Sequence, residues 1–324
     1  MPAKPKVAIY WGASCGGCEE AVVDLAEGIL DVVAAVDLVF WPVALDFKRG
    51  DVEAMPDKSI TAGLVNGAVR TSEQEEMVRL LRKKCVYLLA YGACAHQGGI
   101  PGLANQFQLE QILKYVYEDS PSTVNEGKTR PQTLFKDNGH EVTLPVLRNV
   151  VRALDQVVDV DYYIPGCPPT GKITQQALGA LLSGNLPPRG TVLAPDVALC
   201  DECKRRDSKP TDLQIESFKR PHWTFTDPDK CFLAQGVLCM GPATRKGCEA
   251  MCTAGNMPCT GCFGPTSRVH DQGAKILSSV AGSIAAKTDE EIEKVLSGIP
   301  DPVGSFYRYG LAKSSLRVAI RGER

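Results

Sequence analysis

Thirteen cysteines in a chain of 324 residues constrain the fold more than any other feature of this sequence. Eight of them lie between residues 200 and 262, and the others are spread over the first 167 residues. A secreted scaffold held by disulfides would be shorter and would carry a signal peptide, and the first residues show no apolar segment followed by a cleavage site. In a reducing cytoplasm, so many thiols more often bind metal. The cysteine pattern therefore predicts a cytoplasmic metal-binding protein.

Charge and hydropathy argue against two classes of partner. Lys and Arg number 36 against 38 Asp and Glu, a net charge of -2, so no basic field favours nucleic acid. No run of about 18 apolar residues is present, so no membrane span is predicted. The basic segment 316–324 is interpreted as a solvated or partner-facing tail.

The first 190 residues alternate short β-branched or aromatic runs with longer helix-like segments. The runs typical of strands are residues 6–13, 36–44, 85–93 and 158–166. The segments typical of helices are residues 19–31, 73–84, 106–117, 144–157 and 174–184. This alternation predicts an α/β domain over residues 1–190, in which a doubly wound parallel sheet carries helices on both faces.

Residues 187–196, with the sequence PPRGTVLAPD, interrupt this alternation, and strand and helix signals fade beyond them. One further helix is predicted over residues 288–299. A segment with so little continuous apolar sequence needs another source of order, which bound metal can supply. Residues 191–324 are therefore predicted to form a second, small and irregular domain.

Four cysteines follow strand-like runs of the first domain, namely Cys15, Cys18, Cys94 and Cys167. Since parallel strands share one carboxyl edge, where open α/β sheets bind ligands, these thiols could converge on one metal centre. A redox dithiol would explain only Cys15 and Cys18. Structural zinc also accepts four thiolates, usually from closer in sequence, whereas the Cys-Pro step at 167–168 is found in ferredoxin ligand runs. The residues alone favour an iron–sulfur cluster and leave zinc as an alternative.

The eight cysteines of the second domain are enough for two more sets of four: Cys200, Cys203, Cys231, Cys239, Cys248, Cys252, Cys259 and Cys262. The thirteenth, Cys85, begins a strand-like run that is expected to be buried, and it is interpreted as an inert core thiol. Three clusters, each held by four thiolates, would indicate an electron-transfer chain rather than a catalytic pocket.

Several motifs of the chain resemble those of a known family: GASCGGCEEAV, YGACAHQGGIPGLANQF, VYEDSPSTVN and IPGCPPT, followed by the cysteine ladder. They resemble the small subunit of [NiFe] hydrogenases, above all the cytoplasmic methyl-viologen-reducing type. That type does not reduce the deazaflavin coenzyme and is associated with heterodisulfide reductase. The resemblance covers about residues 6–265, and it implies a flavodoxin-like sheet domain followed by a small iron–sulfur domain.

The resemblance distributes the twelve cysteines over three [4Fe-4S] clusters. It implies that the proximal ligands are Cys15, Cys18, Cys94 and Cys167. It implies that the medial ligands are Cys248, Cys252, Cys259 and Cys262. It implies that the distal ligands are Cys200, Cys203, Cys231 and Cys239.

Two acidic residues, Glu19 and Glu20, follow the first cysteine pair. Carboxylates in the first turn of a helix stabilise the helix and need no other function. In the family, an acidic residue near this motif can face the active site of the large subunit. The resemblance therefore makes Glu20 a proton-path candidate.

The same resemblance implies partner chains. Nickel and the hydrogen-splitting step would belong to a large subunit, and electrons would leave to a further iron–sulfur or flavin subunit, such as one of a heterodisulfide reductase complex. One alternative is the small subunit of a deazaflavin-reducing hydrogenase. Another is the small subunit of respiratory complex I, which keeps only the proximal site. A third, from a different class, is a zinc-stapled interaction module without a redox role.

Overall fold

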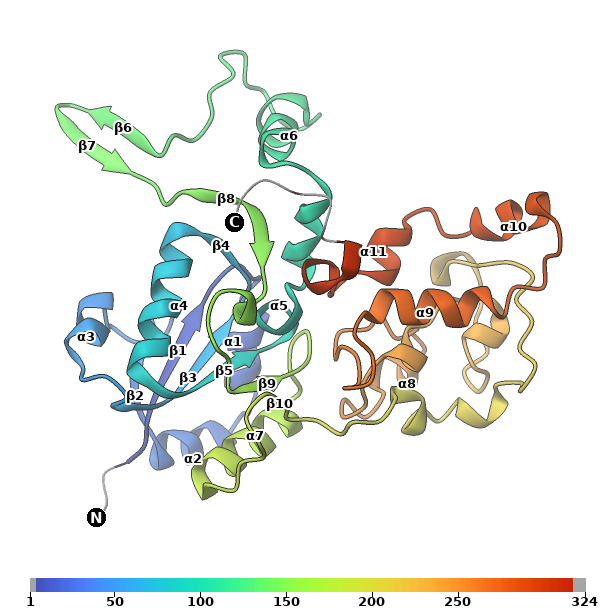
Figure 1. Ribbon diagram of the computed structural model, residues 1–324, viewed down its shortest axis with the longest axis horizontal. Helices are drawn as coiled ribbons and strands as arrows, with labels where there is room; N and C mark the ends of the chain where they lie inside the picture. Colours follow the sequence, from blue (N-terminus) through green and yellow to red (C-terminus); the bar gives the residue numbers. More distant parts are fainter. Residues whose placement is uncertain (1–3, 317–324) are drawn as a thin grey trace.

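The computed structural model describes residues 4–316, and its centre is a parallel sheet of six strands (Figure 1). Across the sheet the strands run in the order β10, β9, β5, β3, β1 and β2, and all five neighbouring pairs are parallel. Their bounds are β1 Lys6–Trp11, β2 Asp37–Phe40, β3 Ile60–Asn66, β5 Cys85–Tyr91, β9 Tyr162–Ile164 and β10 Thr191–Val192. If β10 is left aside and the strands of this sheet are numbered in chain order, they run 2-1-3-4-5, which is the order of flavodoxin-like sheets. The predicted α/β fold is confirmed.

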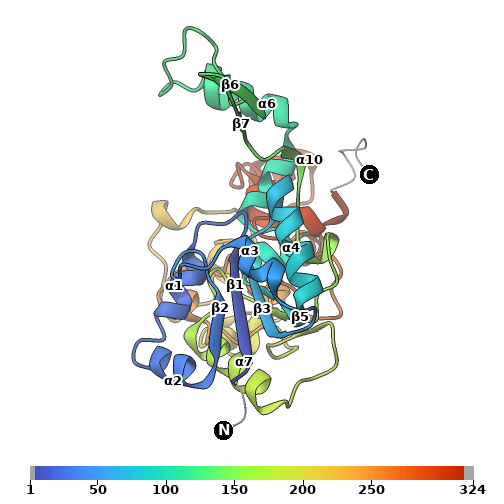
Figure 2. The ribbon, with the colours of Figure 1, turned by 90° about the vertical axis from the view of Figure 1, so that its left-hand side faces the viewer.

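Successive side chains of a strand point to opposite faces of the sheet, and here both faces carry buried apolar side chains. Helices therefore cover both faces. Val7 and Ile9 of β1 point into one core, with α1 (Gly17–Val23), α2 (Gly28–Ala35) and α7 (Gly171–Ser183). Ala8 and Tyr10 point into the other core, with α3 (Arg49–Ala54) and α4 (Ser72–Lys84). Figure 2, in which the left-hand side of Figure 1 faces the viewer, shows α3 and α4 beside the strands.

The predictions for 73–84 and 174–184 are confirmed by α4 and α7. In α4, the Thr71 side chain accepts a hydrogen bond from the Gln74 backbone, which caps the helix. The helix predicted over 19–31 is instead two helices, α1 and α2, because Ala26 between them has the left-handed φ of 52°. The central strand β3 was not expected from the sequence.

The helix predicted over residues 144–157 is wrong. Residues Leu147–Arg152 form β8, antiparallel to β4 (Val69–Thr71), and only the short 3-10 turn η3 (Leu154–Gln156) follows. The buried amide of Asn105 donates to the Val151 carbonyl at 2.9 Å and accepts from the Val151 N–H at 2.8 Å. These bonds satisfy the backbone of β8 in its extended form, and valines favour that conformation.

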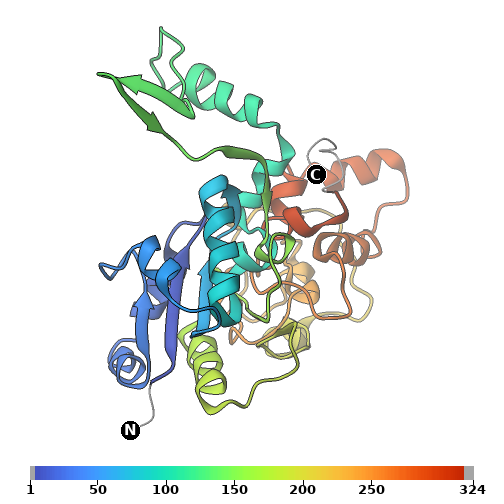
Figure 3. The ribbon, with the colours of Figure 1, turned by 60° about the vertical axis from the view of Figure 1, so that its left-hand side comes forward.

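Residues 107–146 form an arm that projects from the sheet unit (Figures 1 and 3). The helix predicted over 106–117 corresponds to α6 (Leu109–Lys114) and the π turn η2 (Tyr115–Asp119), which begin the arm. It ends in a hairpin of β6 (Leu134–Asp137) and β7 (His140–Thr143), in which all eight residues are exposed.

The second unit contains few regular elements around a core of its own, which includes Phe232, Ile276 and Phe306. The predicted helix 288–299 is confirmed as α10 (Asp289–Leu296), whereas α9 (Gln272–Ala281) and α11 (Pro302–Phe306) were missed. The remaining short helices of the chain are α5 Ala93–Gln97, α8 Met251–Ala254, η1 Ile100–Gln106, η4 Leu199–Asp201, η5 Arg206–Ser208, η6 Pro221–Trp223, η7 Leu233–Gln235, η8 Gly241–Ala243 and η9 Leu311–Lys313.

The division at residue 190 stays a prediction, although the sheet includes β10 just beyond it. The end of the described chain returns to the sheet unit, where Gln156 donates to the Ala312 carbonyl at 3.0 Å. Most of the basic segment 316–324 lies outside the described residues. Within residues 4–316, no helix combines the length and apolar character needed to cross a membrane.

Replacing Asn105 by alanine tests what holds β8 in place. The variant deprives the peptide groups of buried Val151 of their partners, which costs roughly 1–3 kcal/mol. We expect a lower denaturation midpoint under anaerobic conditions, whereas Asn185→Ala, at an exposed position, leaves the midpoint unchanged. Equal midpoints for the two variants would contradict this account of β8.

Candidate metal centres

The structure brings together the four cysteines that follow strands. Cys15 and Cys18 follow β1, Cys94 lies in α5 after β5, and Cys167 follows β9, so all four lie at the carboxyl edge of the sheet. Burial raises the pKa of the Cys18 thiol, and the charges of the other three thiols raise it further. Cys18 and Cys94 are buried, whereas Cys15 and Cys167 are exposed. We name this group the first quartet.

Glycine permits the backbone to lie against these sulfurs. Gly92 has a φ of +88°, and a Cβ there would lie 2.3 Å from Cys18 Sγ. Gly99 has a φ of +58°, and its Cβ would lie 2.4 Å from Cys94 Sγ. Side chains at these two positions would occupy the space that the thiols need.

A polar network ties the loop of the first cysteine pair to β3. The Asn66 amide donates to the Tyr10 carbonyl at 3.2 Å and to Glu19 Oε1 at 3.1 Å. It also accepts from the Ser14 hydroxyl at 2.9 Å. Asn66 is almost fully buried at the end of β3, and sequence reasoning missed it because it missed this strand.

The two acidic residues of α1 have different environments. Glu19 is buried, and burial raises the pKa of its carboxyl above the usual range. Glu20 is exposed on the same helix. The proton-path role of Glu20 stays a prediction.

Two further quartets line adjoining cavities in the second unit. Cys248, Cys252, Cys259 and Cys262 line one cavity and form the second quartet. Cys200, Cys203, Cys231 and Cys239 line the other and form the third quartet. Leu199 and Thr253 line both cavities, so the two quartets are neighbours.

The three quartets follow one another in space. The pKa of Cys262 is raised to about 12, mainly by burial, and the charges of Cys248 in its own quartet and of Cys167 in the first quartet contribute to the rise. Cys262 also packs against the apolar core that contains Cys18 of the first quartet. The pKa of Cys259 is raised by burial and then by the charge of Cys239, which belongs to the third quartet. The second quartet therefore lies between the other two.

Arg205 forms hydrogen bonds that hold the loops of the third quartet in place. Its guanidinium lies 4.3 Å from the ring centre of Phe232 and is buried. It donates to the carbonyls of Asp227 at 2.7 Å and Lys230 at 3.0 Å, directly before Cys231. Sequence reasoning missed Arg205, since an arginine between Lys204 and Arg206 looks like part of an exposed basic run and gives no signal of its buried partners.

Cys85 is fully buried in β5 and packs against Gly63. Burial raises its pKa to about 12, and the charges that modify this value belong to Arg82, Lys58 and Asp161. Cys85 begins β5 and so lies at the amino edge of the parallel sheet, opposite to the edge that carries the first quartet. The structure therefore places Cys85 apart from the first quartet.

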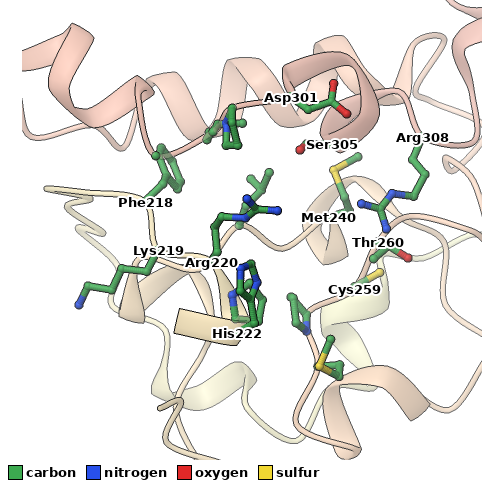
Figure 4. Close-up of a pocket in the computed structure, with 17 residues that line it drawn as sticks. Phe218, Lys219, Arg220, His222, Met240, Cys259, Thr260, Asp301, Ser305 and Arg308 are labelled. Carbon is green, nitrogen blue, oxygen red and sulfur yellow. The ribbon is translucent and has the colours of Figure 1, made fainter. Parts of the chain in front are cut away.

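An open cavity of about 490 Å³ reaches the second quartet from outside (Figure 4). Met240 and Cys259 line its inner part, and Arg220 and Arg308 extend into it from two different segments. The Arg220 guanidinium also lies 5.1 Å from the ring centre of the exposed Trp223. This side of the second unit thus combines positive charge with apolar surface.

The residues of the quartets fit iron–sulfur clusters better than a single ion. Four thiolates are the donor set of [4Fe-4S] clusters, and glycines 92 and 99 keep the backbone close to the sulfurs without a side chain between. Within residues 4–316, no three His, Cys, Asp or Glu side chains are close enough to share one metal ion.

Comparison with known proteins places this α/β chain, with its thiols at the carboxyl edge of the sheet, among oxidoreductase subunits. Residues 15–181 match the family model described as NADH ubiquinone oxidoreductase, 20 Kd subunit. The chain belongs to this family and, over nearly its whole length, to the branch that contains the iron–sulfur subunits of F420-non-reducing hydrogenases. The match to the family model ends before the eight cysteines of the second unit.

Two relatives show how far the similarity extends. The iron–sulfur subunit of the F420-non-reducing hydrogenase of Archaeoglobus profundus is 39% identical over 94% of this chain and 96% of its own. Its counterpart in the F420-non-reducing hydrogenase of Methanothermobacter thermautotrophicus is 34% identical over 100% of this chain and 99% of its own. The resemblance to hydrogenase small subunits is confirmed.

A solved structure supports the fold alone. The [NiFeSe] hydrogenase of Desulfovibrio vulgaris Hildenborough aligns with a TM-score of 0.53 over 82% of this chain and 95% of that chain, at 20% identity. This structural alignment covers a larger part of the chain than the family model, which matches only residues 15–181. The structural similarity therefore includes part of the second unit.

Gly92→Ala tests the close approach of the backbone to Cys18. The new methyl group would collide with the sulfur in a left-handed backbone position, so we expect the variant to bind less iron than the wild type. Gly179→Ala is the matched control, because a Cβ at Gly179 meets no atom within 4 Å. Iron analysis of anaerobically purified protein gives the comparison, and equal iron in both variants would refute the expectation.

Proposed function

We propose that this chain is the electron-transfer small subunit of a cytoplasmic [NiFe] hydrogenase and carries three [4Fe-4S] clusters. The observation that carries the proposal is the row of three cysteine quartets, with the second between the first and the third. When bound, such clusters supply one-electron oxidation and reduction at potentials that depend on burial and on hydrogen bonds to sulfur.

The chain's own residues would perform distinct tasks at the proximal end. Cys15, Cys18, Cys94 and Cys167 would hold the proximal cluster at the sheet edge. Gly92 excludes a side chain from this space, and Asn66 fixes the loop between β1 and α1. The exposure of Cys15 and Cys167 supports a partner that covers this edge, and we assign the nickel site to that large subunit.

The second and third quartets would hold the medial and distal clusters. Arg205 keeps the loops of the third quartet in place through two backbone carbonyls. Its surroundings are basic, since Arg206 and Lys209 line the same cavity. An acceptor subunit with an iron–sulfur or flavin group would dock on this side, and heterodisulfide reductase is the partner that we propose. F420 is the deazaflavin coenzyme, and the relatives are named F420-non-reducing. Their names therefore favour this acceptor over the deazaflavin coenzyme.

Metal analysis tests the proposal. Anaerobically purified chain should contain about twelve iron atoms and about twelve acid-labile sulfides. Cys94→Ala, Cys262→Ala and Cys203→Ala, one for each quartet, should each lower the iron content, with a different electron paramagnetic resonance signal lost in each case. Cys85→Ala is the control and should keep all the iron, because Cys85 lies at the amino edge of the sheet, apart from the first quartet.

Other outcomes of the same analysis are equally informative. About four iron atoms would leave only the proximal cluster, as in the complex I relative, and would defeat the proposal. A colourless protein that releases zinc would instead support the interaction module.

A further inference from the structure

The arm of residues 107–146 contributes nothing to the quartets, although it lies between Cys94 and Cys167 in the sequence. Figures 1 and 3 show it extending away from the sheet, with the β6–β7 hairpin at its outer end. Its shape therefore serves some purpose other than holding a metal centre.

The surface of the arm is unusually apolar. Nine apolar side chains on it are between 45% and 93% exposed: Phe107, Tyr115, Val116, Val124, Leu134, Phe135, Val142, Leu144 and Val146. So many exposed apolar side chains concentrated on one segment indicate an interaction site.

Several charges of the arm are neutralised within the arm. Arg130 forms ion pairs with both Glu110 and Glu118. Lys114 pairs with Asp119 at 2.6 Å. The arm has six acidic and four basic side chains, and these pairs satisfy half of them within the arm. The exposed apolar side chains are therefore the main surface that the arm offers to a partner.

The hairpin at the outer end of the arm gains little stability from its own contacts. Its two strands pair only with each other, through four residue pairs that include Phe135 with Val142 and Lys136 with Glu141. An isolated two-stranded hairpin in water is marginally stable at best, and exposed strand edges favour pairing with another chain. A second surface is needed to hold it.

Backbone hydrogen bonds connect the root of the arm to the first quartet. Ala13, two residues before Cys15, pairs with Ala68, and the next residues form β4, which pairs with β8. Ser72 donates its backbone N–H to the Val146 carbonyl at 2.9 Å, and Val146 donates to the Ser72 hydroxyl at 3.0 Å. The arm is thus anchored to the same sheet edge that exposes Cys15 and Cys167.

We propose that the arm is a docking element for the nickel-bearing large subunit and inserts its apolar side chains into an apolar recess of that partner. This inference rests on the proposed function, which places the large subunit over the exposed thiols of the first quartet. A partner that covers that edge lies next to the root of the arm, and the arm extends the contact. A second copy of this chain fits less well, because it would bring no nickel site to the exposed thiols.

The hairpin offers a matched pair of variants for the test. Phe135→Ser with Val142→Ser removes a cross-strand apolar pair from one face. Lys136→Ser with Glu141→Ser removes the pair next to it, whose side chains point to the other face. Each double variant is co-expressed with the large subunit and purified anaerobically, and its affinity for that subunit is measured together with its own iron content.

We expect the apolar double variant to bind the large subunit about tenfold more weakly or worse, with its iron content unchanged. The polar double variant should bind within about twofold of the wild type. Equal binding by both double variants would overturn the docking role.

Hydrogen exchange of the wild-type chain gives a second readout that needs no variant. In the complex, the backbone amides of residues 107–146 should exchange more slowly than in the free chain. If the wild-type chain binds a nickel-containing subunit while the arm exchanges as fast as before, the docking role alone fails. If the wild-type chain binds no such subunit, the proposed function fails and the docking role fails with it.

Discussion

Close approach of backbone to sulfur is the constraint on which the rest of this structure depends. Four thiols can meet at one point only if little else occupies that point. The carboxyl edge of the parallel sheet supplies the meeting place, and Gly92 and Gly99 remove the side chains that would fill it. The strand order then matters, because β1, β5 and β9 are distant in sequence and must end at the same edge.

The second unit meets the same requirement without a sheet. Short helices and turns surround an apolar core, and two quartets line neighbouring cavities beside it. Cys248 and Cys262 pack against the apolar core of the sheet unit, which contains Cys18, and so join the two units. Arg205 and Asn66 are both buried polar side chains that hold cysteine-bearing loops in place. Asn66 joins the loop of Cys15 and Cys18 to β3, and Arg205 binds the backbone carbonyls directly before Cys231.

The molecule has two different ends with different surfaces. At one end, the sheet edge with exposed Cys15 and Cys167 continues into an apolar arm. At the other, the third quartet and the open cavity near Cys259 are bordered by basic residues such as Arg206 and Arg220. Apolar surface suits a permanent subunit contact, whereas charge suits a partner that associates and leaves. The row of quartets connects these two ends.

The sequence by itself determined the α/β class, the family and the grouping of cysteines near strand ends, because those features are local patterns or motif orders. It did not predict β3, and it assigned a helix to the valine-rich β8, whose partners β4 and Asn105 are remote in sequence. The proximal, medial and distal order of the quartets came from the family resemblance, whereas only the tertiary structure decided the role of Asn66, the role of Arg205 and the exposed arm. Each of these depends on contacts between distant segments, which no local pattern of residues records.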